Sequence, residues 1–380
     1  MTSRIGIDAS NIHDGGGLTH LVELLRTTHP DLHGFEKIYV WAPLATLAQI
    51  KEKPWIMKRS DPLLEQHYLQ RVFWQRKRLG PLLKFEKCDL LFVPGGSFAT
   101  DFRPVVVMNQ NLLPFEWREL LRFGLSRQTL RLMLLRFSQS RSLHHANGSV
   151  FLTKYAMGAL LKVTGEVSGA TTVVPHGVDT RFANPPRKPK PLESYCKQKP
   201  FQLLYVSNVN VYKHQWKVAG AVASLRMRGY PVALDLIGAA SPPSLKRLQR
   251  VMTKADQEGS FIRYLGSKPH DELPACYASV DACVFASSCE NLPNILLESM
   301  ASGLPIACSD RGPMPELLGD AAVYFNPELQ SSIEEALERL LNSPELRYSL
   351  AEKAYQLSQK YTWDKCADQT FEFLSQCIRS

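Results

Sequence analysis

Two apolar runs, 281–286 and 304–308, flank the stretch Ser-Ser-Cys-Glu-Asn-Leu-Pro-Asn-Ile-Leu-Leu-Glu-Ser-Met-Ala-Ser-Gly at residues 287–303. Such runs predict buried strands, and the segment between them has the signals of a short helix. Asn291 suits the N-cap, Pro293 suits the first turn and Gly303 suits the end of the helix. A strand that leads into a helix N-terminus offers backbone N–H groups and a positive dipole end, which favour a phosphate.

Two carboxylates flank this predicted helix start. Glu290 precedes the helix and Glu298 lies inside it. A sugar nucleotide would account for both, because carboxylates accept hydrogen bonds from hydroxyl groups while the diphosphate lies at the helix end. A surface turn with two solvated glutamates is the other interpretation. The stretch taken alone leaves both open.

The length of the chain, 380 residues, exceeds one ordinary α/β core and predicts two domains. The hydrophobic fraction of 44% and charged fraction of 21% are typical of a globular protein, and no apolar run is long enough to span a bilayer. The N-terminus enters a strand directly, with Asp8 where a signal peptide would be apolar. The eight cysteines include no C-x-x-C pair, which favours free thiols, no zinc and a cytoplasmic location.

Positive charge is concentrated in the first half of the chain. Residues 1–190 contain 26 Lys and Arg against 15 Asp and Glu, whereas the remainder carries a net charge of −2. Segment 116–142 alternates six arginines with leucine, methionine and phenylalanine, and 71–78 is a second basic cluster. This pattern predicts a basic amphipathic helix that contacts an anionic membrane at its inner face. A surface helix packed on the sheet is the alternative. Nucleic acid is disfavoured, because no recognisable reader module is present.

The first half has the pattern of a doubly wound sheet. Strand 4–8 leads into a glycine loop at 15–17 and a helix at 18–26, and polar residues follow strand 104–108, where ligands bind in open α/β sheets. Gln110 is among these polar residues. The remaining predicted strands are 37–41, 89–93, 148–153 and 171–175.

The second half alternates strands and helices more regularly. Lys213 follows the first of its strands and precedes a helix, a position from which an ammonium group could reach a phosphate, although a solvated turn lysine has the same pattern. The predicted strands are 201–206, 232–237, 261–265, 282–286, 305–308 and 322–325, with closing helices at 328–360 and 363–378. The predicted divisions are an N-terminal domain at 1–184, a proline-rich linker at 185–200, a C-terminal domain at 201–362, and a helix at 363–380 that packs back on the N-terminal domain.

Two Rossmann-like domains with these motifs in this order resemble the GT-B glycosyltransferases, and most of all the retaining glycosyltransferase family 4. Glu290 and Glu298 match that family's two glutamates separated by seven residues. The resemblance covers essentially the whole chain and is strongest in residues 170–320. The other matching segments are 174–179, 205–213, 264–266, 288–294 and 298–305.

The resemblance implies a role for each matching position. Lys213 would contact the donor diphosphate, Glu290 would hold hydroxyls of the transferred sugar, and Glu298 would bind the ribose. The glycine loop would close over the donor from the N-terminal domain, across a central cleft. The implied donor-binding residues are Gly16, Gly17, Ser207, Lys213, Gly266, Glu290, Asn291, Leu292, Pro293, Asn294 and Glu298, and the implied catalytic residues are Glu290, Lys213 and Gln110.

The chain departs from the family pattern in two places. The arginine that commonly precedes the lysine is absent from Ser-Asn-Val-Asn at 207–210. The frequent His-Asp pair after the fourth N-terminal strand is replaced by Gln110 and Asn111. A glutamine can hydrogen-bond a sugar hydroxyl, but it cannot accept a proton.

Together these features predict a retaining hexosyltransferase that uses a nucleotide-diphospho-sugar and a saccharide acceptor. The basic first half suggests a lipid-linked acceptor in cell-surface polysaccharide assembly. The sequence contains no D-x-D motif, so we expect no metal and no cofactor, with the leaving group stabilised by Lys213 and helix N–H groups. The alternatives are a sugar-nucleotide epimerase on the same fold, a non-catalytic nucleotide-sugar binder and a nucleic-acid binder. An assay of donor hydrolysis or transfer separates an enzyme from a binder.

Overall fold

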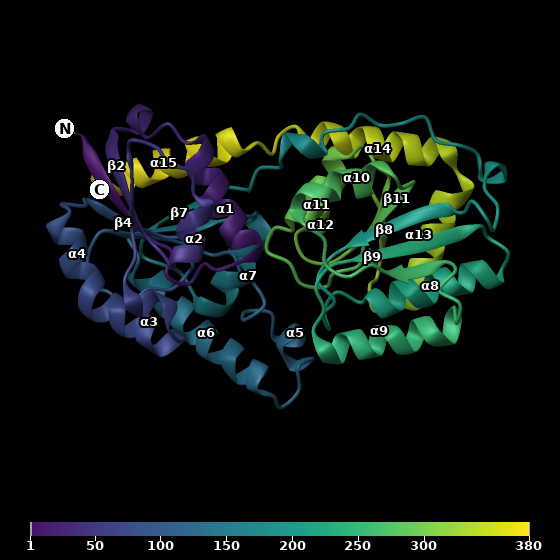
Figure 1. The fold of residues 1–380 in the computed structure, drawn as a ribbon, viewed down its shortest axis with the longest axis horizontal. Helices are drawn as coiled ribbons and strands as arrows, with labels where there is room; N and C mark the ends of the chain where they lie inside the picture. Colours follow the sequence, from purple (N-terminus) through teal and green to yellow (C-terminus); the bar gives the residue numbers. More distant parts are fainter. Residues whose placement is uncertain (1, 380) are drawn as a thin grey trace. The chain divides into compact units, whose positions relative to one another are not determined.

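The computed structural model describes residues 2–379, which form two α/β units (Figure 1). The N-terminal unit comprises residues 2–177 and 362–379, and the C-terminal unit comprises 178–361. The first division therefore lies seven residues before the predicted end of the domain at 184. Val178 already belongs to the C-terminal unit, where its N–H donates to the carbonyl of Tyr361 at 3.0 Å.

The proline-rich segment 185–200, predicted as a linker, is part of the C-terminal unit. The guanidinium of Arg187 donates to the carbonyls of Ala278 and Val280, at 2.6 and 2.5 Å. The hydroxyl of Tyr195 donates to Asp281 at 2.8 Å. Proline composition predicted exposure, but these side chains fix the segment by hydrogen-bonding groups at the end of a neighbouring helix and the start of a strand.

The N-terminal unit is built on a seven-stranded parallel sheet with strand order β3-β2-β1-β4-β5-β6-β7. The order reverses between β1 and β4, and in open α/β sheets ligands bind at the carboxyl ends of strands at such a point. The central strands are apolar and buried because helices cover both faces. The strands are β1 Ser3–Asp8, β2 Phe35–Trp41, β3 Ile56–Arg59, β4 Leu90–Val93, β5 Val105–Met108, β6 Gly148–Phe151 and β7 Ala170–Val173.

The predicted basic helix at 116–142 is broken in the structure. Gly124 has φ +58°, and the hydroxyl of Ser126 accepts a hydrogen bond from the Thr129 N–H, which starts a new helix. The segment is therefore a short helix, a turn and a long helix. The helices of this unit are α1 Gly15–Thr27, α2 Leu44–Gln49, α3 Tyr68–Trp74, α4 Gly80–Phe85, α5 Trp117–Leu121, α6 Arg127–His145, α7 Lys154–Thr164 and α15 Trp363–Arg379.

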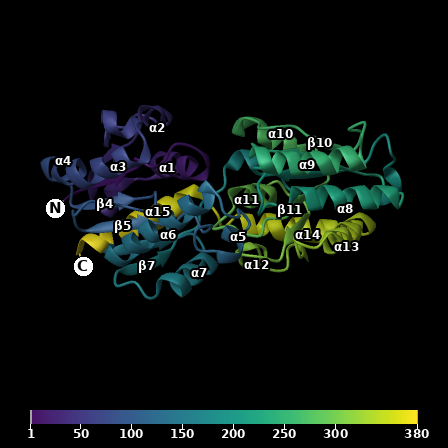
Figure 2. The ribbon, with the colours of Figure 1, turned by 90° about the horizontal axis from the view of Figure 1, so that it is seen from below.

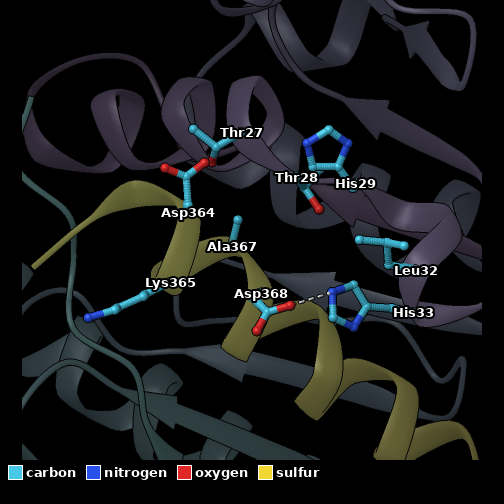
Figure 3. Close-up of a pocket in the computed structure, with 9 residues that line it drawn as sticks. All are labelled: Thr27, Thr28, His29, Leu32, His33, Asp364, Lys365, Ala367 and Asp368. Atoms are coloured by element: carbon cyan, nitrogen blue, oxygen red, sulfur yellow. Dashed lines mark ion pairs between the residues drawn. The ribbon is translucent and has the colours of Figure 1, made fainter.

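The C-terminal helix α15 packs against α1 within the N-terminal unit. The hydroxyl of Thr27 donates to the carbonyl of Trp363 at 3.3 Å, and His33 lies 3.1 Å from the carboxylate of Asp368 (Figure 3). The last residues of the chain thus complete the unit formed by its first half.

The C-terminal unit has a six-stranded parallel sheet with strand order β10-β9-β8-β11-β12-β13, and all six predicted strands are present. Its order reverses between β8 and β11. Figure 2 shows α8 and α9 side by side on this unit. The elements are β8 Phe201–Val206, α8 Gln215–Met227, β9 Val232–Ile237, α9 Pro242–Ala255, β10 Ile262–Tyr264, α10 Leu273–Ala278, β11 Ala282–Phe285, α11 Asn294–Ala301, β12 Ile306–Ser309, α12 Met314–Leu318, β13 Val323–Phe325, α13 Gln330–Asn342 and α14 Pro344–Ser358.

The predicted helix 328–360 is two helices, α13 and α14. Ser343 separates them, and its hydroxyl accepts a hydrogen bond from the Leu346 N–H at 3.1 Å, which caps the second helix. Between residues 2 and 379, none of the helices combines the length and apolar character needed to cross a membrane.

Candidate functional site

Lys213 and Glu290 follow the two neighbouring strands at which the order of the C-terminal sheet reverses. Lys213 lies in the loop after β8, and Glu290 lies in the loop after β11. The two loops are joined by hydrogen bonds. The Ser288 N–H donates to the carbonyl of Tyr212 at 2.8 Å, and the His214 ring lies 2.9 Å from the Ser288 hydroxyl. This is the place at which open α/β sheets bind ligands.

The ammonium of Lys213 pairs with the carboxylate of Glu290. Both side chains are almost buried, with exposed fractions of 9% and 13%. Burial acts to lower the pKa of Lys213, but the Glu290 charge and hydrogen bond outweigh it, so that pKa lies above its ordinary value. Lys213 is therefore cationic at neutral pH, and an ammonium group has three N–H donors.

The backbone of Lys213 is also fixed. The buried hydroxyl of Tyr205, on β8, donates to the Lys213 carbonyl at 2.7 Å. The Lys213 ammonium lies 5.2 Å from the ring centre of Tyr212 and 5.6 Å from that of Phe285, distances at which rings attract cations. The cation is thus held by a carboxylate and two rings at the edge of the sheet.

The helix after β11 begins later than the sequence predicted. Its N-cap is Pro293 and its first residue is Asn294, so Asn291 is not the N-cap. Residues before a proline avoid helical backbone angles, and Pro293 is itself extended. Residues 289–293 therefore form an irregular segment, with a bend at Asn291, between the strand and the helix, and Asn291 and Leu292 are buried within it.

Glu298 lies in α11 and is buried, with 8% of its side chain exposed. Its Oε1 lies 3.0 Å from Nε2 of His270. Its Oε2 is also buried and has no hydrogen-bond partner in the described part of the chain. The buried hydroxyl of Tyr277 lies beside this carboxylate and donates to the carbonyl of Ile295 at 3.3 Å. Burial and the Glu298 charge both raise the pKa of Tyr277. A buried carboxylate oxygen without a donor costs free energy, which a ligand hydroxyl would recover.

Ser207 and Gly266 lie at the same carboxyl edge of the sheet. Ser207 directly follows β8, and its N–H donates to Ile237 at the end of β9. The Gly266 carbonyl accepts from the Gly238 N–H at 2.8 Å, and Gly266 itself has φ +70°. The structure thus brings the C-terminal residues of the predicted donor site to one edge of one sheet.

Gly16, Gly17 and Gln110 belong to the N-terminal unit. Gly15–Gly17 form the first turn of α1, which corrects the prediction of a glycine loop before the helix. Gln110 follows β5, and its Nε2 donates to the Pro94 carbonyl at 3.1 Å. A Cβ on Gly17 would lie 3.6 Å from Oε1 of Gln110, so the two residues are neighbours at the carboxyl edge of this sheet.

His20, which was not predicted from the sequence, lies beside Gln110. Its Nδ1 is 3.5 Å from Nε2 of Gln110, its ring stacks on that of His176 with centres 4.7 Å apart, and its Nε2 is buried without a described partner. Burial, reinforced by His176, holds its pKa well below the ordinary value. His20 is therefore neutral at pH 7. A histidine on the inner face of an apolar helix was the available signal.

A cavity of about 290 Å³ lies between the end of α1 and the start of α15 (Figure 3). It is lined by Thr27, Thr28, His29, Leu32, His33, Asp364, Lys365, Ala367 and Asp368. None of the residues predicted from the sequence to form the site is among them. The predicted site residues therefore lie outside this cavity, and the geometry of charged groups favours the Lys213 and Glu290 loops as the site.

Comparison with known proteins gives a family match and a class of fold. Residues 188–357 match the family model "Glycosyl transferases group 1". The O-antigen chain mannosyltransferase B of Escherichia coli is 29% identical over 123 residues, 32% of each chain. The chain thus matches about a third of the length of this curated relative.

Solved structures match over nearly the whole fold. A sucrose-phosphate synthase from Thermosynechococcus elongatus superimposes with a TM-score of 0.77 and 16% identity, over 98% of both chains. The Anabaena protein HepE, solved with UDP and glucose, superimposes with a TM-score of 0.68 and 16% identity, over 98% of this chain and 100% of its own.

The fold is of the GT-B class, with two Rossmann-like units. Within it, residues 188–357, slightly less than half of the chain, match the group 1 glycosyl transferases. The resemblance inferred from the sequence is confirmed at this level.

Proposed function

We propose that the protein is a glycosyltransferase that binds a nucleotide-diphospho-sugar at the Lys213 and Glu290 loops. The observation that carries this proposal is the arrangement of three side chains. The buried Lys213 pairs with the almost buried Glu290 at the point where the strand order reverses, and the buried Glu298 lies in α11, the helix that follows β11. The match to the group 1 glycosyl transferases and the similarity to a protein solved with UDP and glucose support the same chemistry.

Each residue has a distinct task in the proposed reaction. Lys213 and the N-terminus of α11 stabilise negative charge on the departing diphosphate. Glu290 accepts hydrogen bonds from hydroxyls of the transferred sugar, and the unpartnered Oε2 of Glu298 accepts one from the ribose. The backbone of 291–294 lines the sugar and phosphates.

We further propose that transfer retains the configuration at the sugar carbon and uses no metal. The acceptor oxygen bonds to that carbon on the face from which the diphosphate departs, and the acceptor proton passes to an oxygen of the departing phosphate. This route needs no protein base. Gln110, whose amide already donates to Pro94, would hydrogen-bond a hydroxyl and take no proton.

The test is a panel of UDP- and GDP-linked sugars. The matching donor is expected to raise the melting temperature, because at 100 times its dissociation constant a ligand adds about 2.7 kcal/mol. It is also expected to release nucleoside diphosphate faster when a saccharide acceptor is added. Binding without release or transfer would indicate a non-catalytic binder, and stabilisation by none of the donors would contradict the proposal.

We propose that the acceptor is lipid-linked, as in surface-polysaccharide assembly, and that the α5–α6 segment, residues 117–145, rests on an anionic membrane. The exposed side chains of this segment support the membrane proposal. Seven large apolar side chains and five arginines on it are exposed, and Leu125 at the turn is fully exposed. Apolar side chains that enter the lipid between cations typify interfacial helices. The residues are Trp117, Leu121, Leu125, Leu130, Met133, Leu134 and Phe137, with Arg118, Arg122, Arg127, Arg131 and Arg141.

Replacing Leu125 and Phe137 together by asparagine is expected to weaken binding to phosphatidylglycerol vesicles about tenfold or more, because apolar burial contributes about 1.5–3 kcal/mol per large side chain. The matched control is the double variant Leu32→Asn with Phe85→Asn, which removes an exposed leucine and an exposed phenylalanine elsewhere on the same unit. Vesicle sedimentation at two salt concentrations measures both. Equal binding by the two double variants, or binding insensitive to salt, would contradict the membrane proposal.

A further inference from the structure

His270 contacts Glu298 from an element that carries none of the residues predicted from the sequence. It opens the short 3₁₀ turn at His270–Glu272, between β10 and α10. Its Nε2 lies 3.0 Å from Oε1 of Glu298. The His270 side chain is 44% exposed, whereas the Glu298 side chain is 8% exposed. His270 is therefore the partly solvent-exposed partner of a buried carboxylate.

The surroundings of His270 hold the ring in place and set its charge. The ring packs against Phe182, with centres 5.2 Å apart. The hydrogen bond that His270 donates to Glu298 is the main cause that raises the pKa of His270 above 6.5. Burial acts to lower this pKa, and the Glu298 charge raises it further. Arg181 lowers this pKa and Asp179 raises it. These two residues pair with each other at the 3₁₀ turn Thr180–Phe182, which also carries Phe182. On its own turn, Glu272 pairs with Lys268.

We infer that His270 is a positioning residue: it holds Oε1 of Glu298 so that Oε2 faces the ligand with a free acceptor site. The two oxygens of a carboxylate are equivalent, so a donor that binds one of them fixes the plane of the group and with it the direction of the lone pairs on the other oxygen. The inference rests on the proposed function, because the expected ligand group is a ribose hydroxyl of the nucleotide sugar.

The inference predicts a pH dependence of donor binding. Below the raised pKa of His270, the imidazolium donates a charge-assisted hydrogen bond to Glu298. As pH rises through that pKa, the charge is lost and the orientation of the carboxylate loosens. Donor affinity is therefore expected to be greatest near and below pH 6.5 and to fall as pH increases above it.

Three variants of the full chain test this. His270→Ala removes the donor and is expected to weaken binding of the nucleotide sugar about five- to tenfold at pH 6.5, as for loss of one orienting hydrogen bond. His270→Gln keeps an N–H donor but cannot titrate, so it is expected to restore most of the affinity and to abolish the pH dependence. Glu272→Gln, on the same turn without a contact to Glu298, is the control and is expected to match the wild type.

The probes are UDP-glucose, GDP-mannose and 2′,3′-dideoxyribose analogues of both, titrated by calorimetry between pH 6 and 9. Wild type and His270→Ala are expected to bind the dideoxy analogue equally, because the ribose hydroxyls are missing. His270→Ala affinity equal to wild type at every pH, or an equal loss for the dideoxy analogue, would overturn the positioning role. Failure of the wild type to bind either nucleotide sugar would instead contradict the proposed donor site.

Discussion

Lys213→Ala is expected to lower turnover by about two to three orders of magnitude at saturating donor, as for removal of other groups that stabilise a developing negative charge. Lys213 is cationic, almost buried and held at the edge of the sheet by Tyr205, Tyr212 and Glu290. In the described loops between β8 and α8 and between β11 and α11, Lys213 is the one lysine or arginine. Nucleoside diphosphate release under single-turnover conditions measures the effect.

A loss of turnover has to be separated from a loss of folding, because Lys213→Ala leaves the Glu290 carboxylate almost buried without its cation. The double variant Lys213→Ala with Glu290→Gln removes both charges, so its melting temperature is expected to recover while turnover stays low. Lys246→Ala, an exposed lysine on α9, is the surface control. Near-normal turnover by Lys213→Ala would contradict the role in leaving-group stabilisation.

The second large effect concerns stability. Gly303 ends α11 with φ +61°, and a Cβ there would lie 2.3 Å from the carbonyl oxygen of Asn184. Gly303→Ala therefore combines a left-handed backbone with a backbone clash, and we expect it to cost about 2–4 kcal/mol. For a unit of this size, that lowers the melting temperature by about 5–10 °C.

Gly229 provides the matched control. It ends α8 in the same unit with a positive φ, +95°, and no heavy atom lies within 4 Å of its would-be Cβ. Gly229→Ala is expected to cost only about 1 kcal/mol, the price of the backbone conformation. Calorimetric melting of both variants measures the difference. Equal melting temperatures would contradict the predicted clash, because they would mean that residues 184–186 move away from Gly303 at no cost in free energy.

Every strand except β3, and the charged residues in the loops after β8 and β11, could be predicted from the sequence because both depend on local pattern. The short edge strand β3, Ile56–Arg59, was not predicted. Most of the six strands in the C-terminal unit are short, mainly apolar runs, and Lys213 and Glu290 stand in the polar loops that follow two of them. Parallel strands place their carboxyl ends at one edge, so sequence position alone indicated that these loops are neighbours.

The remaining features depend on contacts between distant segments. The helix α11 starts at Asn294, after the extended Pro293, although Asn291 is the better capping residue by composition. The proline-rich segment is fixed by Arg187 reaching carbonyls some ninety positions away. His270 gave no signal, because a histidine in a turn becomes informative only once Glu298 is known to lie beside it.

The proposed function depends most directly on the donor site formed by Lys213, Glu290 and Glu298. Titration of the UDP- and GDP-sugar panel into the wild type and into Glu298→Gln tests it in one calorimetric measurement. We expect one nucleotide sugar to bind the wild type with one site per chain. The same nucleotide sugar is expected to bind Glu298→Gln at least several-fold more weakly. Absence of binding by the whole panel, or an unchanged affinity in Glu298→Gln, would contradict the proposed function.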